Sequence, residues 1–383
     1  MRVALVVNRF PERSEGFLLD HALGLLDEGV DVHVVADAVD RDALPPALHA
    51  RVHEAPAGAG RRPVVAARAL GNAARSPGAA ARHALRVRGR PAPLARDLPL
   101  ATLRPDVVHT EFLTLARRRT HLPTALGCVL TSSARGYDVA YAGLEDPTYY
   151  DDVWPTLRAL HVLGEDVWRR ARERGCPKDL PHTTITPAVD AEAVPRARPA
   201  ALGPLKLVAV GRLHWKKGHH HALVALARVR AEGVDASLRV VGDGPELEAL
   251  AFARHQLGLD DHVELVGGRD RPGAWAELAD AHVCVHAAVS EGFGNAVLEA
   301  QAAGLPVVCT DAEGLAENVE PDVTGLVVPR RDPEALATAV LALARDPERR
   351  VAMGEAGRRR ARERFRPADQ HAAFAAFFRE AAG

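Results

Sequence analysis

The sequence predicts an α/β protein with two doubly wound domains, each built on a parallel sheet. The chain has 383 residues, which is long for one ordinary domain and sufficient for two domains that each bury a core. Short apolar runs alternate with segments of helical periodicity, as expected when strands are buried on both faces of a parallel sheet. This alternation restarts after a segment rich in proline and alanine at residues 191–204, which is typical of a linker.

The first half begins with one clear strand–helix–strand unit. Residues 2–8 form an apolar run, residues 17–26 have helical spacing, and residues 30–35 form a second apolar run. Because segments long enough for crossover helices separate the later apolar runs, a first domain is predicted at residues 1–195. Its further strands are expected at residues 107–109, 128–132, 160–163 and 183–186.

The second half repeats the alternation, and a second domain is predicted at residues 196–365. Helices are expected at residues 219–232 and 244–257. The last stretch, residues 333–382, is amphipathic and helical, with one interruption close to Pro367. Strands are expected at residues 205–210, 236–241, 263–266, 282–286, 305–309 and 325–328.

Composition excludes several classes of partner and site. The formal net charge is −1, so no overall field favours a nucleic acid. No run approaches the roughly 20 apolar residues that span a bilayer, and the short apolar run at the N-terminus does not resemble a secretion signal. The cysteines are far apart and form no C-x-x-C pair, which favours reduced thiols in a cytoplasmic protein. They are Cys128, Cys176, Cys284 and Cys309.

The segment from Arg61 to Arg96 is rich in arginine and alanine and carries almost no acidic residue. Such a segment is able to meet anionic phospholipid or a polyprenyl-linked acceptor, which predicts a peripheral contact at the inner face of the membrane. A solvated basic face is the alternative. Sedimentation with anionic liposomes at low salt distinguishes the two.

Two glycine-containing segments carry the candidate chemistry. In residues 290–300, a glycine-rich turn opens a helix, so backbone N–H groups there are able to receive a phosphate, and Glu291 and Glu299 are suited to neutral sugar and ribose hydroxyls. In residues 211–218, Arg212 and Lys217 follow a strand at the edge where open α/β sheets bind ligands. Taken singly, the first is also compatible with a solvated helix start and the second with a charged surface loop.

Together these segments resemble retaining glycosyltransferase family 4. The E-x7-E motif of that family corresponds to Glu291–Glu299, and its G-R-L-x-x-K-K-G motif corresponds to Gly211–Gly218. The similarity covers residues 205–365 and is thinner in the first half. It includes Val241–Pro245, Gly314–Glu317, Thr324–Pro329, Asp106–His109, Arg135–Asp138 and Thr186–Asp190. The segment from Phe10 to Phe17 resembles the corresponding segment of the subgroup that builds colanic-acid and capsular polysaccharides.

The resemblance implies a GT-B fold, in which two Rossmann-like domains face each other across a cleft. It implies that residues 1–195 bind the acceptor, residues 196–365 bind the nucleotide-sugar, and a terminal helix at residues 366–383 crosses back to the first domain. Glu299 would hold the ribose, Glu291 would contact the donor sugar, and Arg212 with Lys217 would grip the diphosphate. The other donor-binding residues implied are Gly292, Phe293, Gly294, Asn295, Gly211 and Gly267.

One position departs from the family pattern. Many members have His-Gly where this chain has Arg135–Gly136, and that histidine lies near the reacting carbon. An arginine cannot be a general base at neutral pH. In a front-face retaining mechanism the leaving diphosphate itself takes the proton, so Arg135 is predicted to be a catalytic residue that binds phosphate. Loss of activity is the alternative.

No metal ion and no cofactor are predicted, because the nucleoside-diphosphate sugar is itself a substrate. Asp40-Arg41-Asp42 has the form of a metal-dependent motif but lies in a polar loop, and the side chains of His219–His221 diverge along a helix.

The predicted function is retaining, metal-independent hexosyl transfer to a glycan or polyprenyl-linked acceptor, in exopolysaccharide or cell-surface glycan synthesis. A catalytically silent nucleotide-sugar-binding protein and a sugar-nucleotide epimerase of the same fold are the alternatives. The first would bind nucleotide without turnover, and the second would convert its substrate with no acceptor present.

Overall fold

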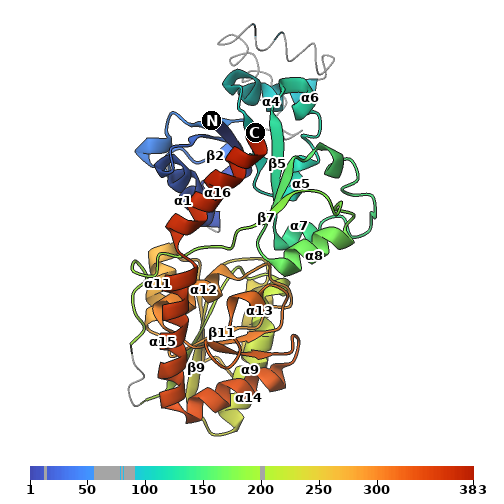
Figure 1. Cartoon of the computed structure of the whole chain (residues 1–383). Coiled ribbons are helices and arrows are strands. Elements are labelled where there is room, and N and C mark those ends of the chain that lie inside the picture. Colours follow the sequence, from blue (N-terminus) through green and yellow to red (C-terminus); the bar gives the residue numbers. More distant parts are fainter. Residues whose placement is uncertain (13–14, 56–77, 79–80, 82–90, 199–202) are drawn as a thin grey trace. The chain divides into compact units, whose positions relative to one another are not determined.

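The computed structural model describes residues 1–12, 15–55, 78, 81, 91–198 and 203–383. The chain forms two compact units: Met1–Ile185 together with His371–Gly383, and Thr186–Gln370 (Figure 1). The first unit therefore ends earlier than the predicted boundary after residue 195. Each unit contains one parallel sheet, so the prediction of two doubly wound, Rossmann-like α/β domains is confirmed.

Within the described residues, the sheet of the first unit has seven strands in the order β3-β2-β1-β4-β5-β6-β7. The order runs outward in one direction from β1 to β3 and in the other from β4 to β7. The carboxyl ends of β1 and β4 therefore flank the switch point at which open α/β sheets bind ligands. The strands are β1 Arg2–Phe10, β2 Asp31–Val39, β3 Val52–Glu54, β4 Val107–Thr110, β5 Val129–Ala134, β6 Ala159–Val162 and β7 His182–Thr184.

Two helices from opposite ends of the chain share one core in the first unit. Leu25 of α1 (Gly16–Asp27) and Phe378 of α16 (Pro367–Ala382) are fully buried with the apolar residues of β1 and β2. Figure 1 shows α16 in red beside α1. The other helices are α4 Pro91–Leu103, α5 Leu113–Ala116, α6 Leu122–Leu126, α7 Gly136–Ala140 and α8 Glu165–Glu173, with short 3-10 turns at Pro46–Leu48 and Trp154–Thr156.

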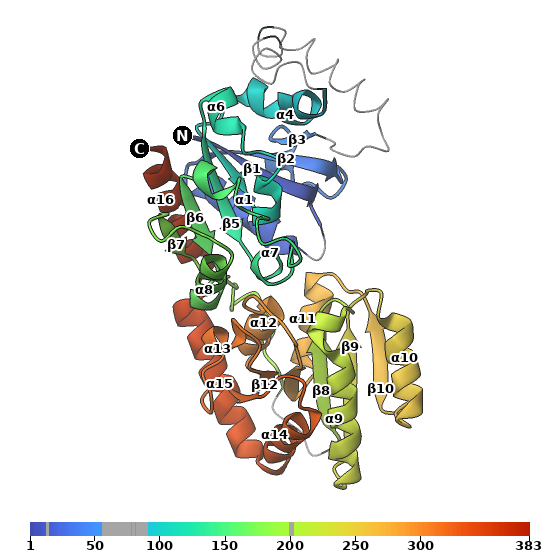
Figure 2. The same ribbon diagram turned by 90° about the vertical axis from the view of Figure 1, so that its right-hand side faces the viewer.

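The sheet of the second unit has six strands in the order β10-β9-β8-β11-β12-β13, and Figure 2 shows helices on both of its sides. Its switch point lies between β8 and β11. The strands are β8 Leu205–Val210, β9 Ala236–Val241, β10 Val263–Gly267, β11 Val283–His286, β12 Val307–Thr310 and β13 Gly325–Val328. The helices are α9 His219–Ala231, α10 Leu247–Gln256, α11 Arg271–Ala279, α12 Asn295–Ala303, α13 Leu315–Asn318, α14 Pro333–Arg345 and α15 Pro347–Arg364, with a 3-10 turn at Trp215–Lys217.

The helical C-terminal stretch has a break that the sequence did not predict. The expectation was one interruption near Pro367, but α14 also ends before Asp346. There the carboxylate of Asp346 accepts the N–H of Arg349 at 2.8 Å, and Pro347 occupies the first position of α15. An aspartate cap followed by proline is a strong start signal for a helix, because the carboxylate accepts a free N-terminal amide and proline has no N–H to leave unpaired.

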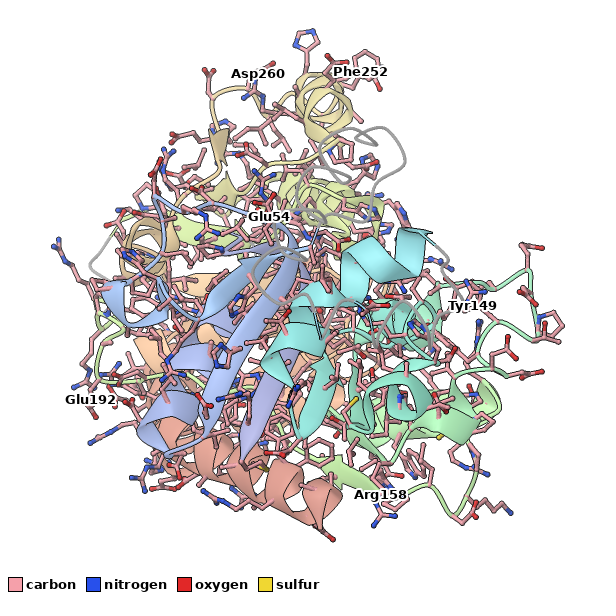
Figure 3. All side chains as sticks on the ribbon, turned by 90° about the horizontal axis from the view of Figure 1, so that it is seen from above. Glu54, Tyr149, Arg158, Glu192, Phe252 and Asp260 are labelled. Atoms are coloured by element: carbon pink, nitrogen blue, oxygen red, sulfur yellow. The ribbon has the colours of Figure 1, made fainter. Side chains whose placement is uncertain are left out.

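The edge strand β3 was also absent from the sequence prediction. It has three residues and ends at Glu54, which Figure 3 labels. A strand this short shows no readable alternation, and short edge strands limit pairing with other chains.

Most of the arginine-rich segment predicted to meet the membrane, including Arg82, Arg86, Arg88 and Arg90, lies outside the described residues. Among the residues that the structure does describe, no helix is both long and apolar enough to cross a membrane.

Candidate donor site

The two glycine-containing segments meet at the carboxyl ends of neighbouring strands. β8 and β11 pair in the sheet, and the loops that follow them are joined by hydrogen bonds. The N–H groups of Val289 and Ser290 donate to the carbonyl oxygen of Lys216, at 2.7 and 3.2 Å. The residues from 211–218 and 290–300 therefore form one site at the switch point of the second sheet.

Gly218 permits the close approach of these loops. Its φ angle is +64°, and a Cβ atom added there would lie 1.9 Å from the carbonyl oxygen of Ala287. A side chain at this position would separate the β8–α9 loop from the β11–α12 loop, so glycine is required by both conformation and space.

Lys217 and Glu291 form an ion pair at the centre of the site. Their side chains are 14% and 13% exposed, and the Nε2 atom of His286 lies 3.1 Å from Glu291 Oε2. Burial alone would raise the pKa of the Glu291 carboxyl, but the Lys217 ammonium and the His286 ring outweigh burial and hold this pKa well below its usual range. Glu291 is therefore a carboxylate at neutral pH, suited to accept hydrogen bonds from neutral hydroxyls.

The glycine turn that opens α12 is held from behind by Asn318. The side-chain amide of Asn318 donates to the carbonyl oxygens of Phe293 and Gly294, both at 2.9 Å, and is itself oriented by Gln301 at 2.7 Å. Gly294 has a φ angle of +91° and stands at the N-cap position. In the first turn of α12 the N–H of Val297 already donates to the carbonyl oxygen of Gly294 at 3.0 Å, so the amides of Asn295 and Ala296 are the helix-start donors suited to an anion.

The other predicted residues of this segment differ in what they can offer a ligand. Asn295, the first residue of α12, is exposed, and Glu299 lies half-buried on the same helix. The Phe293 ring is buried and lies 5.7 Å from the ring of Phe365, so only its backbone is able to contact a ligand.

Gly211 directly follows β8 and Gly267 ends β10, with β9 between these two strands. The N–H of Gly211 donates to the carbonyl of Val241 at 3.0 Å, and the N–H of Gly242 donates to Gly267 at 3.0 Å. Arg212 is exposed beside this row. Gly267, on β10, is therefore three strands away from β11. Lys217 and Glu291, by contrast, lie beside the glycine turn that follows β11.

Lys216 adds a second cation whose charge depends on pH near neutrality. Burial, helped by the charges of Lys217 and Arg212, lowers the pKa of Lys216 to about 8. The Lys216 ammonium is therefore close to titrating when the site is empty, and an anionic ligand would favour its charged form.

Arg135 belongs to the first unit, where it forms a buried ion pair. Its Nε donates to the carbonyl oxygen of Glu111 at 2.8 Å, and its Nη2 donates to the Glu111 carboxylate at 2.8 Å. The guanidinium also lies over the rings of Phe17 and Phe112, at 4.4 and 5.6 Å from their centroids. Arg135 is thus engaged by its own unit, and the role predicted for it in binding phosphate stays a prediction.

Glu111 is fully buried beneath this arginine. His21 Nδ1 of α1 lies 3.0 Å from Glu111 Oε1. Burial alone would raise the pKa of the Glu111 carboxyl, but the His21 ring and the Arg135 guanidinium outweigh burial and hold it well below its usual range. The neighbouring Asp138 caps α7, because its carboxylate accepts the N–H of Arg135 at 2.9 Å.

Sequence reasoning missed Glu111, Glu313 and Asn318, which contact predicted residues, and Arg330, which contacts Glu313. None lies in a local motif of its own, but Glu313 directly precedes the recognised segment Gly314–Glu317, Asn318 directly follows it, and Arg330 directly follows the recognised segment Thr324–Pro329. Among the described residues, no group of three or more His, Cys, Asp or Glu residues is placed to hold a metal ion.

Residues 190–360 match the family described as "Glycosyl transferases group 1". Over 191 residues the chain is 38% identical to a GDP-mannose-dependent alpha-(1-6)-phosphatidylinositol monomannoside mannosyltransferase of Mycobacterium tuberculosis, covering 45% of this chain and 49% of that protein. Over 184 residues it is 34% identical to WcaL of Escherichia coli (strain K12), named as a colanic acid biosynthesis glycosyltransferase, covering 46% and 45%. The chain thus spans about half the length of these curated relatives.

Solved structures match over nearly the whole chain. Sucrose-phosphate synthase from Thermosynechococcus elongatus has a TM-score of 0.79 and 19% identity, with 99% of this chain and 98% of that chain covered. Anabaena Alr3699/HepE in complex with UDP and glucose has a TM-score of 0.77 and 17% identity, with 99% and 100% covered. The predicted resemblance to a glycosyltransferase family and the predicted GT-B type of fold are therefore confirmed.

Proposed function

We propose that this chain, whose residues 190–360 match the glycosyl transferases group 1 family, transfers a sugar from a nucleoside-diphosphate sugar to a hydroxyl of an acceptor. The observation that carries the proposal is the Lys217–Glu291 ion pair beside the glycine turn of α12. This arrangement supplies cations and amides for a diphosphate next to a carboxylate for sugar hydroxyls.

Three parts of the donor, the diphosphate, the sugar and the ribose, are bound by different residues. Lys217 and Arg212 bind the diphosphate, with the first amides of α12 as further donors. Glu291 accepts hydrogen bonds from the donor sugar, and Glu299 accepts hydrogen bonds from the ribose diol. When the diphosphate binds, Lys217 exchanges part of its contact with Glu291 for the phosphate oxygens. The freed Glu291 carboxylate then turns to the sugar hydroxyls.

Catalysis in this proposal is mainly electrostatic. As the bond to the anomeric carbon breaks, negative charge develops on the diphosphate, where Lys217, Arg212 and the α12 amides stabilise it. The same oxygens accept the proton of the attacking hydroxyl, so attack proceeds on the face that the diphosphate leaves and configuration is retained. Because these protein groups supply the positive charge, the transfer proceeds without a metal ion.

The proposed acceptor is a glycan or a polyprenyl-linked glycan, bound by the first unit. The names of two relatives support this class, since one refers to a phosphatidylinositol mannoside and the other to colanic acid synthesis. The proposed location is the cytoplasm, with peripheral contact at the inner face of the membrane. The base of the nucleotide is left to experiment, because one relative is named for GDP-mannose and one similar structure holds UDP.

The test is a transfer assay with UDP-, GDP- and ADP-sugars and a panel of glycan and polyprenyl-linked acceptors, with EDTA and with magnesium. The account predicts transfer from donors of one base, unchanged by EDTA, with a product whose anomeric coupling constant in NMR matches that of the donor. Inverted product would exclude the front-face step, and conversion of the donor without any acceptor would favour an epimerase.

Lys217→Ala and Lys206→Ala form a matched pair for this assay. Lys217→Ala is expected to lower kcat/KM by about 100- to 1,000-fold, because it removes a cation from the leaving diphosphate. Lys206 is an exposed lysine of the same unit that pairs with Asp280 at 2.9 Å, so its loss should leave kcat/KM unchanged. Equal activity of the two variants would remove the electrostatic role of Lys217.

A further inference from the structure

Glu313 lies between β12 and α13 and is bonded on both of its carboxylate oxygens. Its Oε2 accepts the backbone N–H of Glu291 at 2.7 Å, and its Oε1 accepts from Nη1 of Arg330 at 2.9 Å. The side chain is only 8% exposed. The Glu313 carboxylate, which comes from a different loop, therefore holds the backbone N–H of Glu291, the residue that we assign to the donor sugar.

Arg330 connects this carboxylate to the ends of two strands. It follows β13, and its backbone N–H donates to the Asp311 carboxylate at 2.9 Å, while its Nη2 donates to the Asp311 carbonyl oxygen at 2.5 Å. Asp311 directly follows β12. Asp311, Glu313 and Arg330, which we call the carboxylate clamp, therefore join the carboxyl ends of β12 and β13 to the glycine turn before α12.

The clamp packs directly on the turn that it holds. The N–H of Gly314 donates to the carbonyl oxygen of Glu291 at 3.2 Å, so both backbone groups of Glu291 are bonded to residues 313–314. A Cβ atom on Gly314 would lie 2.0 Å from the carbonyl oxygen of Gly292. Figure 2 shows α12, α13 and β12 as neighbours in this unit. The position of Glu291 is thus set by the clamp as well as by Lys217.

The backbone of Glu313 is strained. Its φ angle is +31°, a region that residues with a side chain rarely adopt. A glycine would adopt this conformation freely, but it would leave the Glu291 N–H and the Arg330 guanidinium without this carboxylate. Strain of this kind persists where surrounding contacts over-determine the conformation, and it clusters at ligand-binding sites.

We propose that Glu313, held by Arg330, is a positioning residue that orients Glu291 toward the donor sugar. This inference rests on the proposed function, because it assigns Glu291 to the sugar and Glu299 to the ribose. Loss of the clamp then affects recognition of the sugar and leaves recognition of the nucleotide in place. A merely structural residue would alter stability, or would alter both kinds of binding together.

The experiment compares Glu313→Gly, Glu313→Gln and Arg330→Gln with the control Arg331→Gln. Arg331 is the adjacent arginine and is exposed, so its substitution by glutamine matches the change in charge at 330, and it shares the positive φ of Glu313. Titration calorimetry measures the affinity for UDP and GDP and for their glucose and mannose conjugates, and kinetics measures kcat and KM separately.

Glu313→Gly is expected to bind the nucleoside diphosphate within about threefold of wild type and to lower kcat by tenfold or more. It should also lose the difference in affinity between the nucleotide-sugar and the nucleotide. Glu313→Gln keeps an oxygen for the Glu291 N–H, so its kcat and sugar affinity should be close to those of wild type. The kcat and sugar affinity of Arg330→Gln should lie between those of Glu313→Gly and Glu313→Gln. Arg331→Gln should behave as wild type.

Unchanged kcat and sugar affinity in Glu313→Gly and Arg330→Gln would overturn the inference, as would an equal loss of nucleotide and nucleotide-sugar binding. If Glu313→Gly does not fold, the Gln variants decide the matter by the same readouts. Failure of the wild-type protein to bind either nucleotide would instead reject the proposed function, so the two failures are distinguishable.

Discussion

Each unit of the molecule contains a carboxylate that follows a strand and contacts both a cation and a histidine, but the two clusters are built differently. In the second unit, Lys217 and His286 meet Glu291 in a site that is partly open. In the first unit, Arg135 and His21 meet Glu111, which is fully buried. Arg135 is also covered by two aromatic rings.

The difference lies in which cluster is able to change partners. The lysine ammonium is a point charge on a flexible chain, so Lys217 can exchange Glu291 for a phosphate without leaving the site. The planar guanidinium of Arg135 uses Nε and Nη2 in fixed directions, and removing it would leave Glu111 as a buried charge. A cation, a carboxylate and a histidine are therefore suited to bind a ligand in the second unit, whereas in the first unit they stabilise the fold.

The largest expected effect comes from breaking the first-unit cluster. Arg135→Met should lower the free energy of unfolding of the first unit by about 3–5 kcal/mol, because it leaves the Glu111 carboxylate buried and unpaired. The double variant Arg135→Met with Glu111→Leu should recover most of this loss. Denaturant unfolding of the whole chain measures both.

Arg158→Met serves as the control, since Arg158 is an exposed arginine of the same unit, labelled in Figure 3. Its expected change in unfolding free energy is within about 0.5 kcal/mol. If Arg135→Met is as stable as wild type but transfers no sugar, Arg135 acts on the substrate and the contrast between the two clusters fails.

A smaller effect is expected from loosening the glycine turn of the second unit. Asn318→Ala should lower the unfolding free energy by about 1–3 kcal/mol, because the buried carbonyl oxygen of Phe293 loses its side-chain donor and that of Gly294 keeps only the backbone donors Val297 and Leu298. Nucleotide affinity should fall with it, since the amides of that turn lose their orientation. Asn295→Ala, at the exposed start of the same helix, is the matched control for stability and should change it little.

The smallest effect is a pH dependence specific to the second unit. The pKa of Lys216 is lowered to about 8, so its ammonium is present below that pH and lost above it. Donor affinity should therefore fall by up to about tenfold as pH rises through 8, which corresponds to one pKa unit of coupling. Titration calorimetry from pH 6.5 to 9.5 measures this change, and Lys216→Gln should flatten it. An identical slope in the variant would assign the titration to another group.

The regular elements could be predicted closely because their signals are local. The strands β8, β9 and β13 have the predicted bounds, since each is a short apolar run ended by a glycine or a proline loop. The break at Asp346 and the short strand β3 were missed, because a cap and an edge strand depend on one to three residues.

The site could be predicted only as far as its motifs extend. Lys217 and Glu291 are 74 residues apart, yet both stand in recognisable segments, and the structure brings them together. Glu111 is 24 residues from Arg135 and carries no motif, so nothing in the sequence indicated that Arg135 already has a buried partner. Glu313 and Arg330 adjoin recognised segments but were missed, because their contacts arise only when β12 and β13 pair.

The most direct test of the central claim, that the second unit holds a nucleotide-sugar through its glycine turns, is a thermal-shift panel. Wild type and Glu299→Ala are compared with UDP, GDP, ADP and their sugars, in EDTA and in magnesium. At about 100 times the dissociation constant, the matching nucleotide should stabilise the wild type by about 2.7 kcal/mol. A shift with one base that survives EDTA and disappears in Glu299→Ala is the predicted result, and no shift with any nucleotide would contradict the account.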